Sequence, residues 1–480
     1  MNDWVEQEFR NADLGDNRLN KRLKQIVSRF WETPSASLKS ALRGWKEVVG
    51  AYRFFDNPQA TVASIQESHH DMTVERVREH RRVVLIQDTT ELDYTSKSEL
   101  KGTGPLSSTD RQGFFAHTHL VVTPERLPLG VWKTDLWARD EKEHGKAAKR
   151  KSKPIEEKES YRWLQGYRDA CQLSQLVPDT QVISCADREG DIYEIFEEWH
   201  QRRENGKYAA EWLIRCNQDR STVIGTPGQQ ERIRQSVETG PLLGTVTLSV
   251  KKQVQYKKVK GGSRKKHVRS KRTATLEIRC AEVTLDPPYR RDRKLSRISF
   301  HVVMAKERKP PQGEDPIVWI LLTSMEAKGY EKSLDIVLLY ACRWEIEVFF
   351  RVLKTGCKVE ELQLKEDERI KPAIALYMVV AWRVMYVMKL GRECPDLPCD
   401  MVFEEDEWKA LWVIAHGYDA LQKKPTLGAF LLTVAEFGGY LGRKSDGPPG
   451  PESIWRGLTR VKDFALAWQV FQRQSSNNAG

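Results

Sequence analysis

The chain has 480 residues, of which 30% are charged and 40% hydrophobic, and its net charge at pH 7 is +11. This length suggests two or three domains, and the composition is that of a globular protein and excludes a disordered one. The longest apolar stretch, which includes residues 374–382, is far shorter than the roughly 20 residues that cross a bilayer, so no integral membrane protein is expected. The eight cysteines form no Cys-x-x-Cys pair and no signal pattern is seen, so we expect a cytoplasmic protein.

The positive charge is concentrated in two stretches. Residues 251–310 contain 20 basic and 5 acidic residues, and within them residues 251–272 contain eleven basic residues and no acidic one. A second run, residues 146–153, has five basic residues in eight. Concentrated positive charge binds phosphate backbones by counterion release, which favours a nucleic-acid partner. A solvated basic loop or hairpin is the alternative interpretation.

The first 70 residues are predicted to be helical. Asp16 can cap a helix that begins at Asn17, and apolar residues then recur at helical spacing. A break at Pro34-Ser35 precedes a further helix from about residue 37 to 55. Basic residues lie among the apolar ones, which is compatible with docking on DNA, although a generic helical subdomain has the same pattern.

From residue 80 the pattern changes to strands that alternate with helices. The predicted elements are, in order, strands at 83–86, 115–122 and 129–138, a helix at 156–176, a strand at 180–186, a helix at 191–203 and a strand at 209–216. The order β-β-β-α-β-α-β is that of a ribonuclease-H-like sheet. The predicted fold class is therefore α/β, with a mixed-sheet core between all-helical N-terminal and C-terminal domains.

Residues 218–316 do not continue this order. They alternate with β-type spacing and contain the stronger basic run, with a turn at 261–263, so we interpret them as a β-rich insertion. A long helix is predicted from about residue 331 to 355, and the chain beyond 371 is mostly helical. The last helix has apolar residues at spacings of 4, 3, 4 and 3, at Ile454, Leu458, Val461, Ala465 and Trp468. This heptad-like seam fits pairing with a partner helix or packing on its own domain.

Two aspartates are predicted to follow apolar strands. Asp88 comes after the strand at 83–86 and Asp187 after the strand at 180–186. Such residues are often only turn formers, but two on neighbouring central strands would converge at one edge of the sheet. Because like carboxylates raise each other's pKa, the pair would need a compensating charge, which a divalent metal supplies.

The helix around residue 347 offers a third carboxylate. On one continuous helix, Tyr340, Arg343, Glu347 and Lys354 fall within about 60° of one another, beside the apolar face. Glu345 points elsewhere and is the poorer candidate. A surface ion pair between Arg343 and Glu347 is the alternative interpretation.

Three carboxylates, Asp88, Asp187 and Glu347, can hold two Mg²⁺ ions about 3.5–4 Å apart. Hard oxygen donors without His or Cys favour Mg²⁺, with Mn²⁺ as a substitute, over Zn²⁺. One ion would activate water or a DNA 3′-hydroxyl, and the other would stabilise the leaving oxygen. The set predicts in-line phosphodiester chemistry, with the basic surface holding the nucleic-acid backbone.

Four segments form a specific combination of motifs: Ala51-Tyr-Arg-Phe-Phe-Asp-Asn-Pro58, Asp88-Thr-Thr90, Asp187-Arg-Glu-Gly-Asp-Ile192, and Tyr340-x-x-Arg-Trp-x-Ile-Glu-x-Phe349 with Leu353-Lys-Thr-Gly356. This combination resembles bacterial DDE cut-and-paste transposases of the insertion-sequence-four family, the family of the transposon Tn-five transposase. The resemblance covers nearly the whole chain in the same order.

The resemblance implies a helical DNA-end-binding domain at 1–70, a ribonuclease-H-like catalytic core at 71–370 with its insertion at 218–316, and a helical dimerisation domain at 371–480. It implies nicking of each transposon end, hairpin formation and opening, and joining of the 3′-OH ends to target DNA. The implied partners are double-stranded DNA, both terminal inverted repeats and target, and a second copy of the chain in a DNA-bound synaptic complex. No membrane partner is implied.

The resemblance also assigns roles to single residues. Asp88, Asp187 and Glu347 would be the metal-binding triad. The predicted phosphate contacts at the cleaved end are Tyr340, Arg343 and Lys354, with Arg215 as a basic residue nearby. Trp319 would fill the stack when a base is flipped, and the predicted end-binding arginines are Arg22 and Arg53.

One departure from the family concerns the stacking pocket. Where the relative has tandem Trp after Gly, this chain has Gly113-Phe114-Phe115. Phe115 can still stack on a flipped base, but with less surface, so the hairpin step is the one affected. A strand Trp such as Trp319 is otherwise usually a core residue. A segment at 158–160 with Trp163 also resembles the family.

Two other functions are compatible with the same residues. A ribonuclease-H-type nuclease would have the same active site but no strand transfer, so it would give cut ends and no joined product. A non-enzymatic DNA-binding inhibitor of transposition would have lost a catalytic acid or the N-terminal module. This chain retains both, which argues against the inhibitor.

Overall fold

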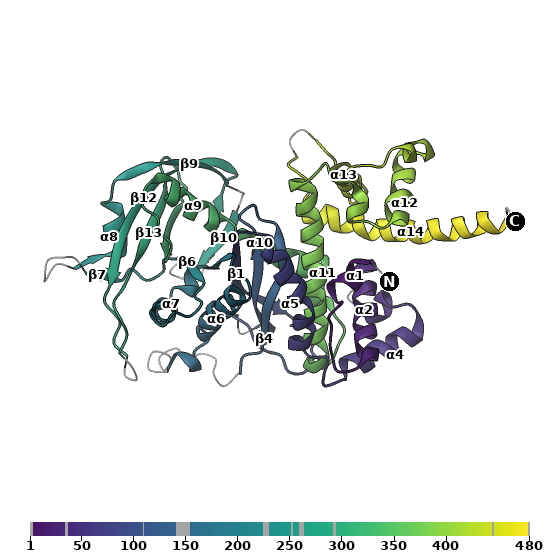
Figure 1. Cartoon of the computed structure of the whole chain (residues 1–480), viewed down its shortest axis with the longest axis horizontal. Helices are drawn as coiled ribbons and strands as arrows, with labels where there is room; N and C mark the ends of the chain where they lie inside the picture. The colour runs from purple at the N-terminus through teal and green to yellow at the C-terminus, as the bar shows by residue number, and fades with distance from the viewer. Residues whose placement is uncertain are drawn as a thin grey trace. The chain divides into compact units, whose positions relative to one another are not determined.

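Figure 1 shows a computed structural model of the chain. It describes residues 3–33, 37–108, 110–140, 154–223, 230–250, 253–258, 264–290, 294–443 and 446–478. Three predicted features therefore lie outside the described residues: the break at Pro34-Ser35, the basic run at 146–153 and the turn at 261–263.

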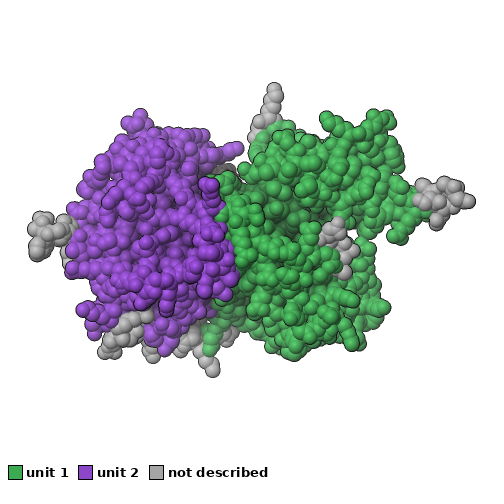
Figure 2. All heavy atoms as spheres, in the orientation of Figure 1, with its two compact units in different colours: residues 1–80, 88–152, 344–480 green, residues 81–87, 153–343 purple. Residues whose placement is uncertain are grey.

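The chain divides into two compact units, which Figure 2 draws in different colours. Unit 1 consists of residues 1–80, 88–152 and 344–480, and unit 2 of residues 81–87 and 153–343. The predicted core at 71–370 contributes to both units. The predicted domain boundaries stay predictions.

Unit 1 begins with helices α1 (Asp3–Glu8), α2 (Asn17–Glu32), α3 (Leu38–Ala41), α4 (Gly44–Phe55) and α5 (Val62–Arg78). The predicted cap of α2 is confirmed, because the Asp16 side chain accepts the Arg18 N–H at 2.7 Å. The single helix predicted at 37–55 is wrong. Leu42 and Arg43 are extended and Gly44 has φ 75, a conformation open to glycine, so the chain turns between α3 and α4.

The sheet of unit 1 uses the second half of β1 (Arg82–Asp93) together with β2 (Gly104–Pro105), β3 (Gln112–Val122) and β4 (Pro128–Trp137). Strand β3 lies between β1 and β4 and pairs antiparallel with β4. Helices α5 and α11 (Asp367–Glu393) pack on β4 (Figure 1). The Trp382 indole donates to the Pro128 carbonyl at 2.9 Å and fixes α11 there.

Helix α11 is, among the described residues, the one helix long and apolar enough to cross a membrane by length and composition. However, 83% of its apolar window is buried inside the structure. Its Tyr377 ring stacks on Phe30 with 4.2 Å between centroids. Helix α11 is therefore accounted for as the central core helix of unit 1.

The C-terminal helices are α12 (Glu405–His416), α13 (Leu427–Phe437) and α14 (Pro451–Asn478). Helix α14 packs along α12 and α13 (Figure 1), and the first four residues of the predicted seam, Ile454, Leu458, Val461 and Ala465, are buried there. This part of the seam therefore packs on its own domain, the second of the two interpretations. Beyond it, Leu466, Val470 and Phe471 are exposed.

Unit 2 contains the predicted mixed sheet. The first half of β1 pairs in parallel with β5 (Gln181–Ala186), and β5 pairs in parallel with β6 (Glu211–Arg215). The crossovers that parallel strands require contain α6 (Tyr161–Leu176) and α7 (Tyr193–Glu204). The α/β fold class predicted from the element order is confirmed.

The insertion extends this sheet. Strand β14 (Val318–Thr323) pairs antiparallel with β6, followed by β13 (Ile298–Glu307), β12 (Arg272–Leu285) and β9 (Leu242–Val250). Short strands β7 (Ser221–Val223) and β8 (Gln230–Arg232) continue from β12, and α8 (Ile233–Glu238) packs on β12 and β13. In the basic run, β10 (Gln253–Lys258) and β11 (Arg264–Arg269) pair as a separate antiparallel hairpin.

Candidate active site

Asp88 lies inside β1, so its predicted place after the end of a strand is wrong. The apolar run ends at Ile86, but the hydrogen-bonded strand continues to Asp93, because pairing beside β3 does not require apolar side chains. Asp88 is half-buried, and its carboxylate accepts the Thr89 N–H at 2.8 Å. The Thr89 hydroxyl in turn lies 2.9 Å from a ring nitrogen of His117 on β3.

Asp187 directly follows β5, as predicted. It is half-buried and caps a 3-10 turn at Arg188–Gly190, with its Oδ1 accepting the Glu189 N–H at 2.7 Å. This local bond fixes the carboxylate at the carboxyl end of β5. Asp191 in the same motif is a further functional candidate that was not predicted from the sequence, although its position in the motif could have indicated it.

The single helix predicted at 331–355 is interrupted. Helix α9 (Tyr330–Ala341) ends in tightened turns, with the Arg343 N–H bonded to the Tyr340 carbonyl at 3.0 Å, and α10 runs from Trp344 to Arg351. A π-helical turn then covers Val352–Gly356. The premise of one continuous helix from Tyr340 to Lys354 is therefore wrong, and the shared helical face stays a prediction.

Four of the predicted site residues gather in unit 2 near Asp187. The Tyr340 ring, 2% exposed, meets Trp319 edge to face with 5.4 Å between centroids. Arg215, at the end of β6, donates to the Val318 carbonyl at 3.1 Å. Arg343 is buried, with 8% of its surface exposed. These residues come from β6, β14 and the end of α9, which the sheet and its covering helix bring together.

The pKa values of Tyr340 and Arg215 respond to the charged groups around them. Burial raises the pKa of Tyr340 to about 12, and Asp187 adds to this increase while Arg343 and Arg215 oppose it. Burial lowers the pKa of Arg215, and Arg343 lowers it further, because the two cations repel. Partly desolvated cations of this kind can attract an anion such as a phosphate.

Unit 1 contains the other two predicted carboxylates and Lys354. Glu347 is half-buried in the first turn of α10. Lys354, in the π-helical turn, donates to the backbone carbonyl of Glu91 in β1 and lies 3.5 Å from the Glu360 carboxylate. The π turn therefore ties Lys354 to the strand that carries Asp88.

Phe115 is a covered residue of unit 1. It is 4% exposed, stacks on Trp137 with 5.3 Å between ring centroids, and has the Arg139 guanidinium 4.1 Å above its ring. A flipped base would have to displace one of these neighbours. Trp319 in unit 2 is half-buried and is therefore less covered than Phe115.

The donor set of the predicted triad fits a divalent metal chemically, since all three side chains are half-buried carboxylates. Asp88 and Glu347 belong to unit 1 and Asp187 to unit 2. Within the described part of the chain, no group of three or more His, Cys, Asp or Glu side chains is gathered that could hold a metal ion. The triad stays a prediction.

The two predicted end-binding arginines lie in the N-terminal helices. Arg22 of α2 is half-buried, donates to Gln25 at 2.8 Å, and places its guanidinium against α4 at Gly50, where a Cβ would lie 2.5 Å from the Arg22 Cζ. Arg53 is exposed on α4.

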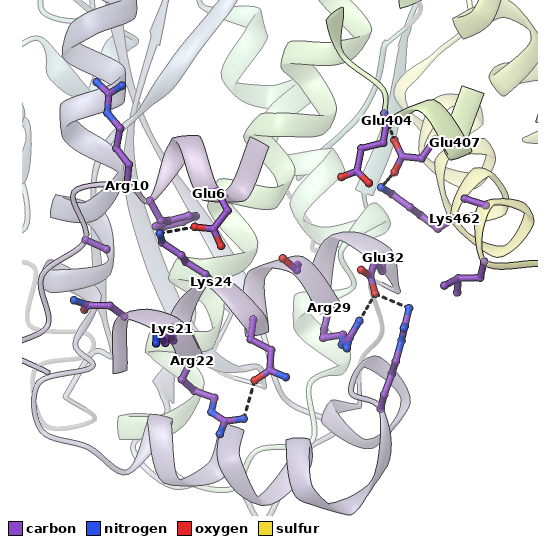
Figure 3. Close-up of a pocket in the computed structure, with 18 of the residues that line it drawn as sticks. Glu6, Arg10, Lys21, Arg22, Lys24, Arg29, Glu32, Glu404, Glu407 and Lys462 are labelled. Atoms are coloured by element: carbon purple, nitrogen blue, oxygen red, sulfur yellow. Dashed lines mark hydrogen bonds and ion pairs between the residues drawn. The ribbon is translucent and has the colours of Figure 1, made fainter. Parts of the chain in front are cut away.

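Arg22 also lines a cleft of about 1040 Å³ between the N-terminal helices and residues of α12 and α14 (Figure 3). Much of its charge is internally paired. The pairs drawn there include Lys24 with Glu6, Arg29 with Glu32 and Lys462 with Glu407.

Three family descriptions match successive parts of the chain. "Transposase DNA-binding" matches residues 1–60, "Transposase DDE domain" residues 206–382, and "Transposase Tn5 dimerisation domain" residues 379–477. A DNA-binding part, a DDE part on a mixed α/β sheet and a dimerisation part together define a DNA transposase that forms dimers. The chain is a Tn5-like DDE transposase. DDE transposases normally use a divalent metal.

Proposed function

We propose that the protein carries out cut-and-paste transposition. It binds the terminal inverted repeats of its transposon, cleaves each end through a hairpin intermediate, and joins the 3′-OH ends to target DNA. The observation that carries this proposal is the grouping of Asp187 with Tyr340, Arg215 and Arg343 in unit 2, since a carboxylate beside two cations and a hydroxyl supports phosphodiester chemistry. The family match supplies the DNA-binding and dimerisation parts.

Asp88, Asp187 and Glu347 would hold the metal, Mg²⁺ or in its place Mn²⁺. When bound, two such ions activate the attacking oxygen and stabilise the leaving oxygen. The chain's own contribution is to keep the carboxylates fixed. The Asp187 carboxylate is held by a hydrogen bond from the Glu189 N–H within the turn after β5. The Asp88 carboxylate is held by a hydrogen bond from the Thr89 N–H.

Arg343, Arg215 and Tyr340 hold the phosphates of the cleaved end. A buried guanidinium binds an anion more strongly than an exposed one, because water competes less. With a pKa of about 12, the Tyr340 hydroxyl keeps its proton at neutral pH and therefore donates to a phosphate oxygen. Lys354 adds a positive charge beside β1.

Trp319 is the proposed stacking surface for the flipped base during hairpin formation. Its ring is half-buried against Tyr340, so a base placed on it would be next to the phosphate-binding groups. Phe115 is the secondary candidate, since Trp137 and Arg139 cover it. The reaction takes place in a dimeric synaptic complex, and the protein is cytoplasmic and associates with the nucleoid when it binds DNA.

The test is a cleavage and strand-transfer assay with terminal-repeat DNA, labelled target DNA and Mg²⁺. We expect nicked ends, hairpins and joined products from the wild type. Asp88→Ala, Asp187→Ala and Glu347→Ala should each abolish cleavage and retain end binding in a gel shift. Cut ends without hairpin or joined product would identify a plain nuclease, and Mg²⁺-dependent nicking by a variant would reject its carboxylate as a ligand.

A further inference from the structure

Asp191 is the fully enclosed carboxylate of the motif at 187–192. Its side chain has 0% exposure, and its Oδ2 accepts the backbone N–H groups of Asn217 and Gln218, both at 2.7 Å. Its Oδ1 accepts from the Arg220 guanidinium, which also donates to the Asp191 carbonyl at 2.9 Å. Two backbone N–H groups and the Arg220 cation already engage this carboxylate, so it is suited to joining two backbone segments rather than to binding metal.

Both segments carry residues predicted for the active site. Asp191 lies four residues after Asp187, at the centre of a tight turn with φ −75 and ψ 68, in which the Ile192 N–H bonds to the Gly190 carbonyl at 2.8 Å. The loop at 217–220 follows β6, whose last residue is Arg215.

The parallel pairing of β5 with β6 ends at Ala186 and Ile214. Beyond that point the two chain ends are joined through Asp191 and Arg220. Asp187 and Arg215 each lie one residue past the last β5–β6 pair, between that pair and this connection, and Arg215 still pairs with Leu321 of β14.

Packing at Gly190 limits how the turn at residues 187–191 can move. A Cβ at Gly190 would lie 2.5 Å from the Ala186 Cβ and 3.1 Å from Cε3 of Trp163 on α6. Arg188 and Glu189 are exposed to solvent. Packing therefore opposes movement toward Trp163, and the bonds to Asp191 oppose movement toward solvent.

We propose that Asp191 and Arg220 are positioning residues for the phosphodiester chemistry. Their ion pair, with the two N–H bonds to Asp191, holds the turn that carries Asp187 and the loop that follows Arg215 in one arrangement. The inference rests on the proposed function. Removing a group that orients a metal ligand typically lowers metal affinity or activity about 10- to 100-fold.

The test uses the full-length protein with terminal-repeat DNA and measures the nicking rate as a function of Mg²⁺ concentration. Asp191→Asn keeps the side-chain shape and removes the charge. We expect its nicking rate to fall about 10- to 100-fold at fixed Mg²⁺ and the Mg²⁺ concentration for half-maximal rate to rise. Mn²⁺ should restore part of the rate, and end binding should be unchanged. Arg220→Lys should give a smaller change in the same direction.

Glu307→Gln is the matched control. Glu307 is also a buried carboxylate of unit 2, 2% exposed, which pairs with Arg272 at 2.8 Å and accepts the Ile317 N–H at 2.9 Å. We expect it to lower the melting temperature while the Mg²⁺ dependence stays that of the wild type.

If Asp191→Asn has the Mg²⁺ dependence of the wild type, the positioning role alone is overturned. Where Asp191→Asn does not fold, the same result in Arg220→Lys overturns it. The same would follow if Glu307→Gln shifted the Mg²⁺ dependence as much as Asp191→Asn did. A wild-type protein that does not cut terminal-repeat DNA would instead overturn the proposed function and this inference with it.

Discussion

Glu345 of α10 forms a buried ion pair with Lys389 of α11, with 2.9 Å between carboxylate oxygen and ammonium nitrogen. The two side chains are 6% and 12% exposed, respectively. Glu347, two residues further along α10, is half-buried. The two glutamates therefore differ in function: Glu345 fixes α10 onto the core helix of unit 1, and Glu347 is the candidate for metal binding.

Glu345→Ala should destabilise the protein by about 3–5 kcal/mol, because it leaves the Lys389 ammonium buried without its partner. Chemical denaturation measures this loss. The double variant Glu345→Met with Lys389→Met should recover most of it, since it removes both charges and retains the buried volume. Glu347→Ala should change the unfolding free energy by less than about 1 kcal/mol and still abolish cleavage. Equal destabilisation by Glu345→Ala and Glu347→Ala would contradict this division.

Gly190→Ala should disturb the turn that carries Asp187. The added Cβ would lie 2.5 Å from the Ala186 Cβ, so the backbone must shift, at a cost of about 1–3 kcal/mol. We expect a lower melting temperature and slower nicking with end binding retained. Ala186→Gly in the same chain removes the closer clashing atom and should restore part of both quantities, since the contact with Trp163 remains. A Gly190→Ala protein with wild-type stability and rate would show that the turn tolerates this displacement.

Much of the fold could be predicted because its signals are local. The cap at Asp16 and the place of Asp187 after β5 depend on a few adjacent residues, and the order of strands and helices follows from apolar periodicity. The strand around Asp88 was predicted too short for the same reason. Its second half is defined by pairing beside β3, which apolar residues do not reveal.

The features that could not be predicted depend on contacts distant in sequence. The turn between α9 and α10 interrupts a stretch whose composition favours helix throughout. Asp191 meets Arg220 across 29 positions, and nothing near Asp191 in the sequence indicates that partner. The apolar seam of α14 could be recognised, but the surface that covers it, α12 and α13, could only be found in the structure.

His119 should make stability depend on pH. It is buried on β3 opposite Lys133, and burial together with that charge lowers its pKa from 6.5 to about 3. Below pH 6.5 the unfolded chain binds a proton that the folded chain does not, so stability is full above pH 6.5 and is lost as pH falls toward 3. The loss between pH 7 and 5 should be about 2 kcal/mol.

The measurement is the unfolding free energy of wild type and His119→Phe at pH 7 and pH 5. Phe keeps a buried ring and cannot bind a proton, so the variant should lose about 2 kcal/mol less than the wild type over this range. Other groups contribute equally to both proteins. Parallel pH profiles for the two would mean that His119 accepts a proton in the folded state.

Gly50→Ala tests whether Arg22 binds DNA from the position that it occupies in the structure. A Cβ on Gly50 would lie 2.5 Å from the Arg22 Cζ, so the guanidinium must leave its place against α4. The helix itself should gain about 0.5–1 kcal/mol, because Ala replaces Gly in its interior. The variant should therefore be at least as stable as the wild type and bind the transposon end more weakly, by about 1–3 kcal/mol if Arg22 contacts a base.

Gel shifts with terminal-repeat and unrelated DNA at one salt concentration measure this effect, with Arg22→Ala as the reference for complete loss. Gly50→Ala and Arg22→Ala should both bind the terminal repeat more weakly than the wild type. If Arg22→Ala binds the terminal repeat weakly while Gly50→Ala binds it as tightly as the wild type, Arg22 reaches DNA in another conformation. Full affinity in both would remove Arg22 from the DNA-binding surface, because neither the side chain nor its place against Gly50 would then matter for end recognition.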